Sequence, residues 1–141
     1  MRVGISLTSN HPGVEDPRLG ARWMIERAAA AHRAGLDSLF VGDQHVSPTH
    51  YYQNTPMLGR LLTKWGKAPA GCLFLLPLWH PVLVAEQIGT LAAIAQGPSS
   101  CNVGSAGARL GSPRWAPTSK CVLRLSRKPL TSSGAYWRAK P

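Results

Sequence analysis

The 141-residue sequence has few cysteines and no long apolar segment, and each shortage excludes a class of protein. Cys72, Cys101 and Cys121 form no CxxC pair and leave one thiol over in any pairing scheme, so neither a disulfide framework nor a zinc site is predicted. The longest apolar run, residues 70–79, is roughly half of what a membrane span needs, and the N-terminus has no signal-peptide pattern. We therefore expect a cytoplasmic protein without a membrane contact.

Acidic residues are absent from the last third of the chain. Residues 1–97 hold eight Lys/Arg and six Asp/Glu, whereas residues 98–141 hold eight Lys/Arg and no acid, so +8 of the net charge of +10 lies in the latter. From Pro98 onward Gln, His, Ile, Met and Phe are also missing, and no hydrophobic period of two or 3.6 can be followed. We predict a domain at 1–97 and an irregular or disordered basic tail at 98–141.

Short apolar strands alternate with helical patterns over residues 1–97. Asp16 and Pro17 are typical of a helix start, because Asp accepts from free first-turn amides and Pro gives up a donor that has no partner there. A helix between two short strands predicts parallel pairing, and hence an α/β fold with three βα units. The predicted elements are a strand at 3–7, a helix from 16 to 35, a strand at 39–41, a helix at 56–64, a strand at 70–76 and a helix from 81 to 94.

Polar residues follow the second predicted strand directly, as Gly42, Asp43, Gln44 and His45. Parallel strands deliver functional side chains at their carboxyl ends. A carboxylate beside an imidazole can hold its tautomer and raise its basicity, which suits proton transfer. The alternative is that Asp43 caps a turn and His45 is a buried structural histidine.

These residues resemble the bacterial luciferase-like superfamily of flavin- or deazaflavin-dependent monooxygenases and oxidoreductases, which are β/α barrels. The resemblance covers nearly all of residues 1–97 and rests on four stretches: MRVGISL at 1–7, GLDSLFVGDQHV at 35–46, YYQNTPM at 51–57 and FLLPLWHPVLVAEQIGTL at 74–91. It implies the first three units of a (β/α)8 TIM barrel. The barrel is incomplete here, because a whole one typically needs about 250 residues.

The resemblance also implies an activity and a set of site residues. The expected reaction is oxidation of a small organic substrate with oxygen and with reduced FMN or deazaflavin supplied by a separate reductase, and full-length relatives are expected to be homo-oligomers. We expect no metal. The implied residues are His45 and Asp43 for catalysis, Ser6, Gln44, Leu76 and Pro77 for the cofactor, and Tyr51, Asn54 and His80 for the substrate.

Each of these assignments has a plainer alternative. Leu76 can be ordinary core, His80 a solvent-facing turn histidine, and Tyr51 a common loop residue. Gln44 stands where family members often carry a histidine, and Gln cannot act as a general base near neutral pH. If His45 transfers the proton, the replacement of that histidine by Gln44 does not affect catalysis.

The pattern of residues 1–97 leads us to expect a fourth strand after Gly97, but the sequence from Pro98 onward predicts none. We offer a hypothetical cause in the gene. Family members continue with a strand and a glycine-rich turn, and the codons of residues 98 onward, shifted by one base, permit such a sequence, with one glycine forced by Trp115. We hypothesise that a base was lost next to Gly97. Three strands cannot close a barrel, so we expect this chain alone to be poorly stable and inactive.

The basic tail offers an alternative function, a small βαβ module that binds nucleic acid. Basic and aromatic side chains together can contact phosphates and stack on bases. We favour the simpler interpretation of scattered charge without binding, and so expect no nucleic-acid partner. The residues concerned are Arg109, Arg114, Lys120, Arg124, Arg127, Lys128, Arg138 and Lys140, with Trp115, Tyr136 and Trp137.

Overall fold

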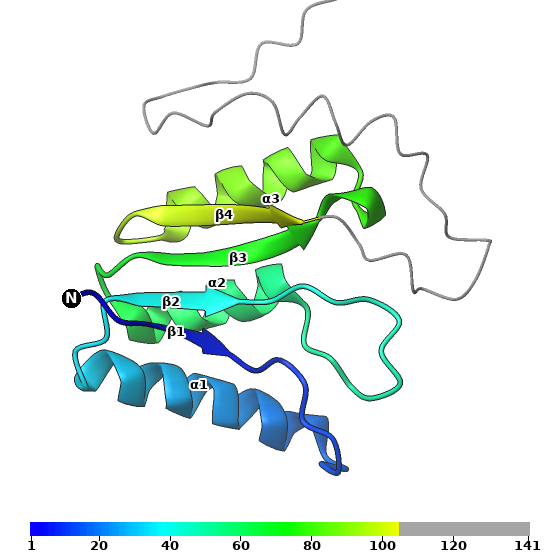
Figure 1. The fold of residues 1–141 in the computed structure, drawn as a ribbon, viewed down its shortest axis with the longest axis horizontal. Coiled ribbons are helices and arrows are strands. Elements are labelled where there is room, and N and C mark those ends of the chain that lie inside the picture. The colour runs from blue at the N-terminus through cyan, green and yellow to red at the C-terminus, as the bar shows by residue number, and fades with distance from the viewer. Residues whose placement is uncertain (105–141) are drawn as a thin grey trace, which may run out of the picture.

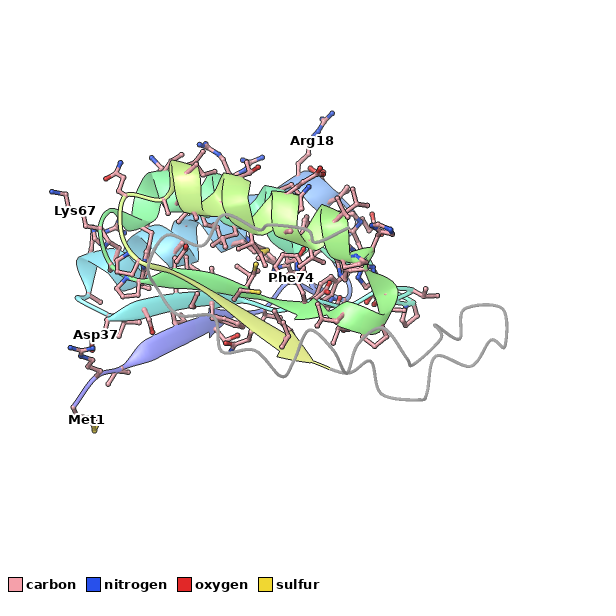
Figure 2. All side chains as sticks on the ribbon, turned by 90° about the horizontal axis from the view of Figure 1, so that it is seen from above. Met1, Arg18, Asp37, Lys67 and Phe74 are labelled. Atoms are coloured by element: carbon pink, nitrogen blue, oxygen red, sulfur yellow. The ribbon has the colours of Figure 1, made fainter. Side chains whose placement is uncertain are left out.

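The computed structural model describes residues 1–104, which form a parallel four-stranded sheet with three helices on one face (Figures 1 and 2). The strands lie in the order β1-β2-β3-β4, and every neighbouring pair is parallel. The predicted α/β fold is confirmed. The elements are β1 (Gly4–Leu7), α1 (Pro17–Arg33), β2 (Ser38–Val41), α2 (Asn54–Trp65), β3 (Ala70–Leu75), the 3-10 turn η1 (Leu76–Leu78), α3 (Pro81–Ile94) and β4 (Ser99–Gly104).

The ends of α1 follow from the sequence. The carboxylate Oδ1 of Asp16 accepts from the Arg18 N–H at 2.9 Å, and Pro17 is the first helical residue. Gly35 follows the helix with a φ of 76°, a left-handed conformation that glycine adopts without strain. The predicted start and stop of this helix are confirmed.

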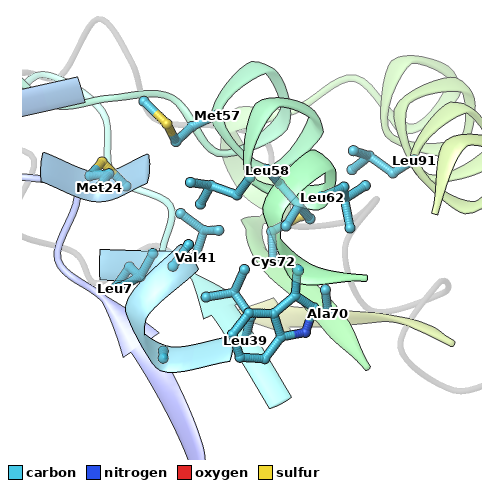
Figure 3. Close-up of a cluster of buried hydrophobic side chains, with 14 of the residues drawn as sticks. Leu7, Met24, Leu39, Val41, Met57, Leu58, Leu62, Ala70, Cys72 and Leu91 are labelled. Atoms are coloured by element: carbon cyan, nitrogen blue, oxygen red, sulfur yellow. The ribbon is translucent and has the colours of Figure 1, made fainter. Parts of the chain in front are cut away.

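The hydrophobic core lies between the sheet and the helices (Figure 3). Leu39 and Val41 of β2 point into it, as do Cys72 and Phe74 of β3. The apolar face of α2 is buried against them. It consists of Met57, Leu58, Leu61 and Leu62.

The opposite face of the sheet has no helix over it among residues 1–104. Side chains alternate along a strand, so Phe40 points away from the core, and the ladder sets it beside Ser6 of β1. Leu73 and Leu75 of β3 point the same way and are only half-buried. Although β3 is apolar along its whole length, within the described residues helices cover only one of its faces.

Strand β4 corrects the prediction that no secondary structure follows Pro98. Its six residues pair with all six of β3, and the Ala70 N–H donates to the Pro98 carbonyl oxygen at 3.1 Å. The preceding loop packs closely, since a Cβ on Gly97 would lie 2.0 Å from the Lys67 carbonyl oxygen. β4 is held by backbone pairing and is mostly exposed, so it lacks the apolar pattern on which the prediction relied. The rest of the predicted tail, residues 105–141, lies outside the described residues.

Candidate functional site

The candidate site lies at the carboxyl edge of the sheet, where the loops that follow β1, β2 and β3 meet (Figure 1). All strands are parallel, so their carboxyl ends share this edge. In β/α folds that edge carries the active site, because loops there can vary without disturbing the core.

Asp43 is the buried centre of this edge, with its side chain fully inaccessible. Its Oδ2 accepts from the Leu75 N–H at 2.8 Å and from the Trp79 indole N–H at 2.7 Å. The β2–β3 ladder ends at the pair Val41 and Cys72, so the carboxylate joins the two strands beyond their last backbone pair. Asp43 therefore has a structural role whatever else it does.

The other oxygen of Asp43 faces His45. Asp43 Oδ1 and His45 Nε2 lie 3.1 Å apart, close enough for an ion pair if the imidazole is protonated. The two atoms are not aligned as a hydrogen bond, and both are buried without any hydrogen-bond partner. Unpaired buried polar atoms cost about 1–3 kcal/mol each and are typical of sites that take up a further group.

The residue after His45 has a strained backbone. Val46 has a φ of 52°, the left-handed region, which a β-branched side chain rarely occupies. Such a conformation costs roughly 1–3 kcal/mol and occurs often in functional loops. Val46 is 78% exposed, so its own side-chain packing does not offset that cost.

The loop after β1 forms the opposite wall of the site. Asn10 pairs with Tyr51 as an isolated antiparallel bridge, and the Ser9 carbonyl oxygen accepts from the Tyr52 N–H at 2.9 Å. Burial raises the pKa of the Tyr51 phenol; the adjacent Ser9 hydroxyl lowers it, and the charge of Asp43 raises it further. Ser9 Oγ is buried beside the phenol without a hydrogen bond of normal alignment. Ser9, Tyr51, Asp43 and His45 thus form one cluster.

Of the residues predicted for the cofactor, none is buried. The Ser6 side chain is exposed on the open face of the sheet, and Gln44 is exposed while its backbone oxygen accepts from Gln53 Nε2 at 3.4 Å. Leu76 and Pro77 lie half-buried in η1. All four remain accessible at or near the carboxyl edge, so their cofactor roles stay predictions.

Two of the three residues predicted for the substrate have their polar atoms engaged in local structure. Asn54 is 0% exposed; its amide donates to the Leu73 carbonyl oxygen at 2.6 Å and accepts from the Thr55 N–H at 2.7 Å. The exposed His80 caps α3, and its Nδ1 accepts from the Val82 N–H at 3.3 Å. We therefore do not carry Asn54 into the proposed site, and only Tyr51 joins the cluster.

Sequence analysis missed Ser9 and Trp79. Trp79 contacts His45 edge-to-face with ring centroids 5.7 Å apart, besides its bond to Asp43. A tryptophan in the loop after a barrel strand is a usable indication, because a partly buried indole N–H needs an acceptor. Ser9 carried no such indication.

Residues 1–104 also form a shallow cleft outside this cluster, and they contain neither a metal-binding group of side chains nor a membrane-spanning helix. A shallow cleft lined by Trp23, Glu26, Arg27 and Ala30 lies on α1, away from the strand ends. Within this part of the chain no cluster of His, Cys, Asp and Glu could hold a metal ion. None of the described helices is both long and apolar enough to span a membrane. The basic and aromatic residues of the predicted nucleic-acid tail lie outside the described residues.

Comparison with known proteins finds one matching family and several similar structures. The model of the luciferase-like monooxygenase family matches residues 1–110, which extends past the expected boundary at Gly97. One similar structure is the oxygenating constituent of 3,6-diketocamphane monooxygenase from the CAM plasmid of Pseudomonas putida, a type II Baeyer-Villiger monooxygenase in complex with FMN; it has a TM-score of 0.68 and 23% identity and covers 76% of this chain and 30% of that one. Another is apo-MsnO8, with a TM-score of 0.71 and 22% identity, covering 81% of this chain and 35% of that one.

At these identities the similar structures establish the fold alone. The chain spans about a third of the length of both, with 30% and 35% of their chains covered. No curated protein matches the sequence.

Proposed function

The chain belongs to the luciferase-like monooxygenase family, and on that premise we propose that it is the N-terminal part of a flavin-dependent monooxygenase in which His45 transfers a proton and Asp43 orients it. The substrates would be oxygen and a small organic compound. Reduced FMN or a reduced deazaflavin, delivered by a separate reductase, would be the cofactor. A similar structure holds FMN, which favours FMN of the two.

The observation that carries this proposal is the pair of unpartnered atoms at the strand ends. Asp43 Oδ1 and His45 Nε2 are buried, 3.1 Å apart and without hydrogen bonds. A proton carried by either atom can pass to a third group only if that group reaches the same place, which is what a bound substrate or flavin edge would do. The carboxylate cannot turn away, because its other oxygen is held by two donors.

The accessible residues around this pair suit a flavin ring. Leu76 and Pro77 offer an apolar surface for its face, and the exposed Gln44 amide can bond to its edge. When bound, reduced flavin would supply the electrons that activate oxygen. This chain's residues would orient the ring, limit water near His45 and hold the proton at Nε2. Phosphate-binding loops of β/α barrels usually belong to later units.

We also propose that this chain does not turn over alone. β1 and β4 each have one neighbour among the described strands, and no helix of residues 1–104 covers the face of Phe40, Leu73 and Leu75. In a closed barrel further strands would occupy both edges and fill the interior. We keep the proposal of a basic tail produced by a lost base, but we move that base from the codon next to Gly97 to a point beyond residue 110, because residues 99–104 pair with β3 and the family match runs to residue 110.

We propose two further properties for the complete enzyme. A homo-oligomer of the complete enzyme is supported by α3, where Val82, Leu83 and Ile94 are 55%, 51% and 53% exposed. A cytoplasmic location is supported by the free thiols of Cys72 and Cys101, which suit a reducing compartment.

The test is flavin binding by the full chain, measured anaerobically as the absorbance change of reduced FMN. We expect weak binding and no substrate oxidation. His45→Gln should weaken binding roughly tenfold, the effect of one lost hydrogen bond in a buried site. His50→Gln is the matched control, since the exposed His50 lies in the same loop and should have no effect.

Repeating the titration with a deazaflavin chooses between the cofactors. If neither flavin binds, or if His50→Gln and His45→Gln weaken binding equally, the assigned site is wrong. Steady turnover by the monomeric chain would contradict its status as a fragment.

A further inference from the structure

The tight turn that follows β3 places Trp79 next to the carboxyl edge of the sheet. The 3-10 turn η1 reverses the chain, and the Trp79 N–H donates to the Leu76 carbonyl oxygen at 3.1 Å. The indole then packs edge-to-face on Phe74, with ring centroids 5.2 Å apart. Phe74 is 0% exposed and lies in the interior between sheet and helices (Figure 2), so the indole rests on a rigid support.

This support aims the indole N–H at Asp43. The 2.7 Å bond to Oδ2 joins the 2.8 Å bond from the Leu75 N–H, so one carboxylate oxygen has two donors. Two donors on one oxygen fix the plane of a carboxylate, because rotation about its Cβ–Cγ bond would break both. Oδ1 is thereby left pointing at His45, the ring of which lies against the same indole.

We infer that Trp79 is a positioning residue, which sets the direction of the Asp43 carboxylate and thereby the state of the His45 imidazole. The inference rests on the proposed function for its importance, since it concerns the same proton-transfer pair. Trp79 itself touches neither a reacting atom nor, in this role, the substrate. The competing explanation is that Trp79 only fills space beside Phe74.

A second tryptophan provides the matched control. Trp65 is 0% exposed, its indole N–H donates to the Pro69 carbonyl oxygen at 3.0 Å, and its ring centroid lies 5.7 Å from that of His32. Trp79 lies at the same 5.7 Å from His45. The two sites share an indole hydrogen bond and a neighbouring histidine, and they differ in the acceptor, a backbone carbonyl in one case and the Asp43 carboxylate in the other.

The experiment compares Trp79→Phe with Trp65→Phe in the full chain with ¹⁵N-labelled histidine. Imidazole nitrogen shifts report hydrogen bonding and protonation far more strongly than ring currents. We expect Trp79→Phe to shift the Nε2 resonance of His45 towards its position in Asp43→Asn, and to leave His32 unchanged. Trp65→Phe should leave His45 unchanged. In the Asp43→Asn background Trp79→Phe should add no further shift, because the two act through one contact.

A reciprocal measurement covers the case in which Trp79→Phe does not fold. Asp43→Asn should move the indole N–H resonance of Trp79 and hasten its exchange with solvent several-fold, while the indole of Trp65 stays as in the wild type. The inference would be overturned if the His45 Nε2 resonance did not move in Trp79→Phe, or if the Trp79 indole N–H resonance did not move in Asp43→Asn. It would also be overturned if the wild-type imidazole nitrogen shifts of His45 were the same as those of the exposed His50. Flavin titration of the same samples separates the proposed function from the positioning role. If Trp79→Phe shifts the His45 resonance but the chain binds no flavin, the function is refuted and the positioning role stands.

Discussion

β3 and β4 lie side by side over six paired residues, yet they differ in what holds them. β3 has a strand on either side and sends Cys72 and Phe74 into the core. Within residues 1–104 β4 has one neighbouring strand, and its residues are exposed or half-buried. Backbone hydrogen bonds are therefore enough to extend this sheet, whereas the burial of apolar side chains is what makes a strand visible in the sequence. Their paired residues allow the difference to be measured position by position.

The largest expected contrast is between Phe74 and its partner in the ladder, Val103. Phe74 is fully buried and Val103 is 47% exposed. Phe74→Ala should lower the free energy of unfolding by about 3–5 kcal/mol, through lost burial and the cavity left behind. Val103→Ala should change it by less than about 0.5 kcal/mol. Urea unfolding of both variants checks this, and similar losses would mean that β4 is as well packed as β3.

The next contrast is between two thiols that are also partners in the ladder. Burial, with smaller contributions from Cys101 and Asp43, raises the pKa of Cys72 from 9.0 to about 12, and burial raises that of Cys101 to about 11. The unfolded chain loses these protons first, so each thiol lowers stability as pH rises above about 9, by about 1.4 kcal/mol per pH unit. The loss should continue to about pH 12 for Cys72 and end near pH 11 for Cys101.

Unfolding of wild type, Cys72→Ala and Cys101→Ala at increasing pH measures these losses. Groups other than these two thiols titrate equally in all three proteins, so only the differences between the curves count. Because Cys101 contributes to the raised pKa of Cys72, the Cys101→Ala difference also includes the loss of that contribution. Identical curves for Cys72→Ala and wild type would show that the Cys72 thiol ionises freely in the folded protein.

The smallest effect is in amide hydrogen exchange along β4. In an edge strand, every second backbone N–H faces the neighbouring strand and the others face the open edge. The amide exchange rates of residues 99–104 should therefore alternate between slow and fast, differing by roughly tenfold or more. Ala70 to Cys72 of β3, which have strands on both sides, should all be slow. Uniformly fast exchange over residues 99–104 would restore the prediction of no regular structure after Pro98.

Much of the fold could be predicted because it depends on local patterns. Asp16, Pro17 and Gly35 define α1 through their own backbone preferences, and the apolar face of α2 follows from its spacing. β4 could not be predicted, because its residues are mostly polar and show no hydrophobic period. The extent of the family match shows the same limit, since it runs to residue 110 and not to Gly97.

The sequence predicted some members of the side-chain cluster at the strand ends and missed others. The strand-end rule indicated Asp43 and His45, which do lie together, and the loop after β2 did supply Tyr51. The family resemblance also implied Asn54 for the substrate, and in the structure the Asn54 amide joins α2 to β3. An amide that binds a ligand and one that binds a backbone carbonyl look the same in a sequence.

The sequence by itself determined the alternation of strands and helices up to α3, the parallel sheet and the edge where polar groups would gather, because hydrophobic periodicity and capping act over a few residues. Only the tertiary structure decided that Trp79 bonds to Asp43, thirty-six positions away, and that β4 joins the sheet. Those contacts arise between groups that meet after folding, and nothing in the neighbourhood of either partner specifies the other.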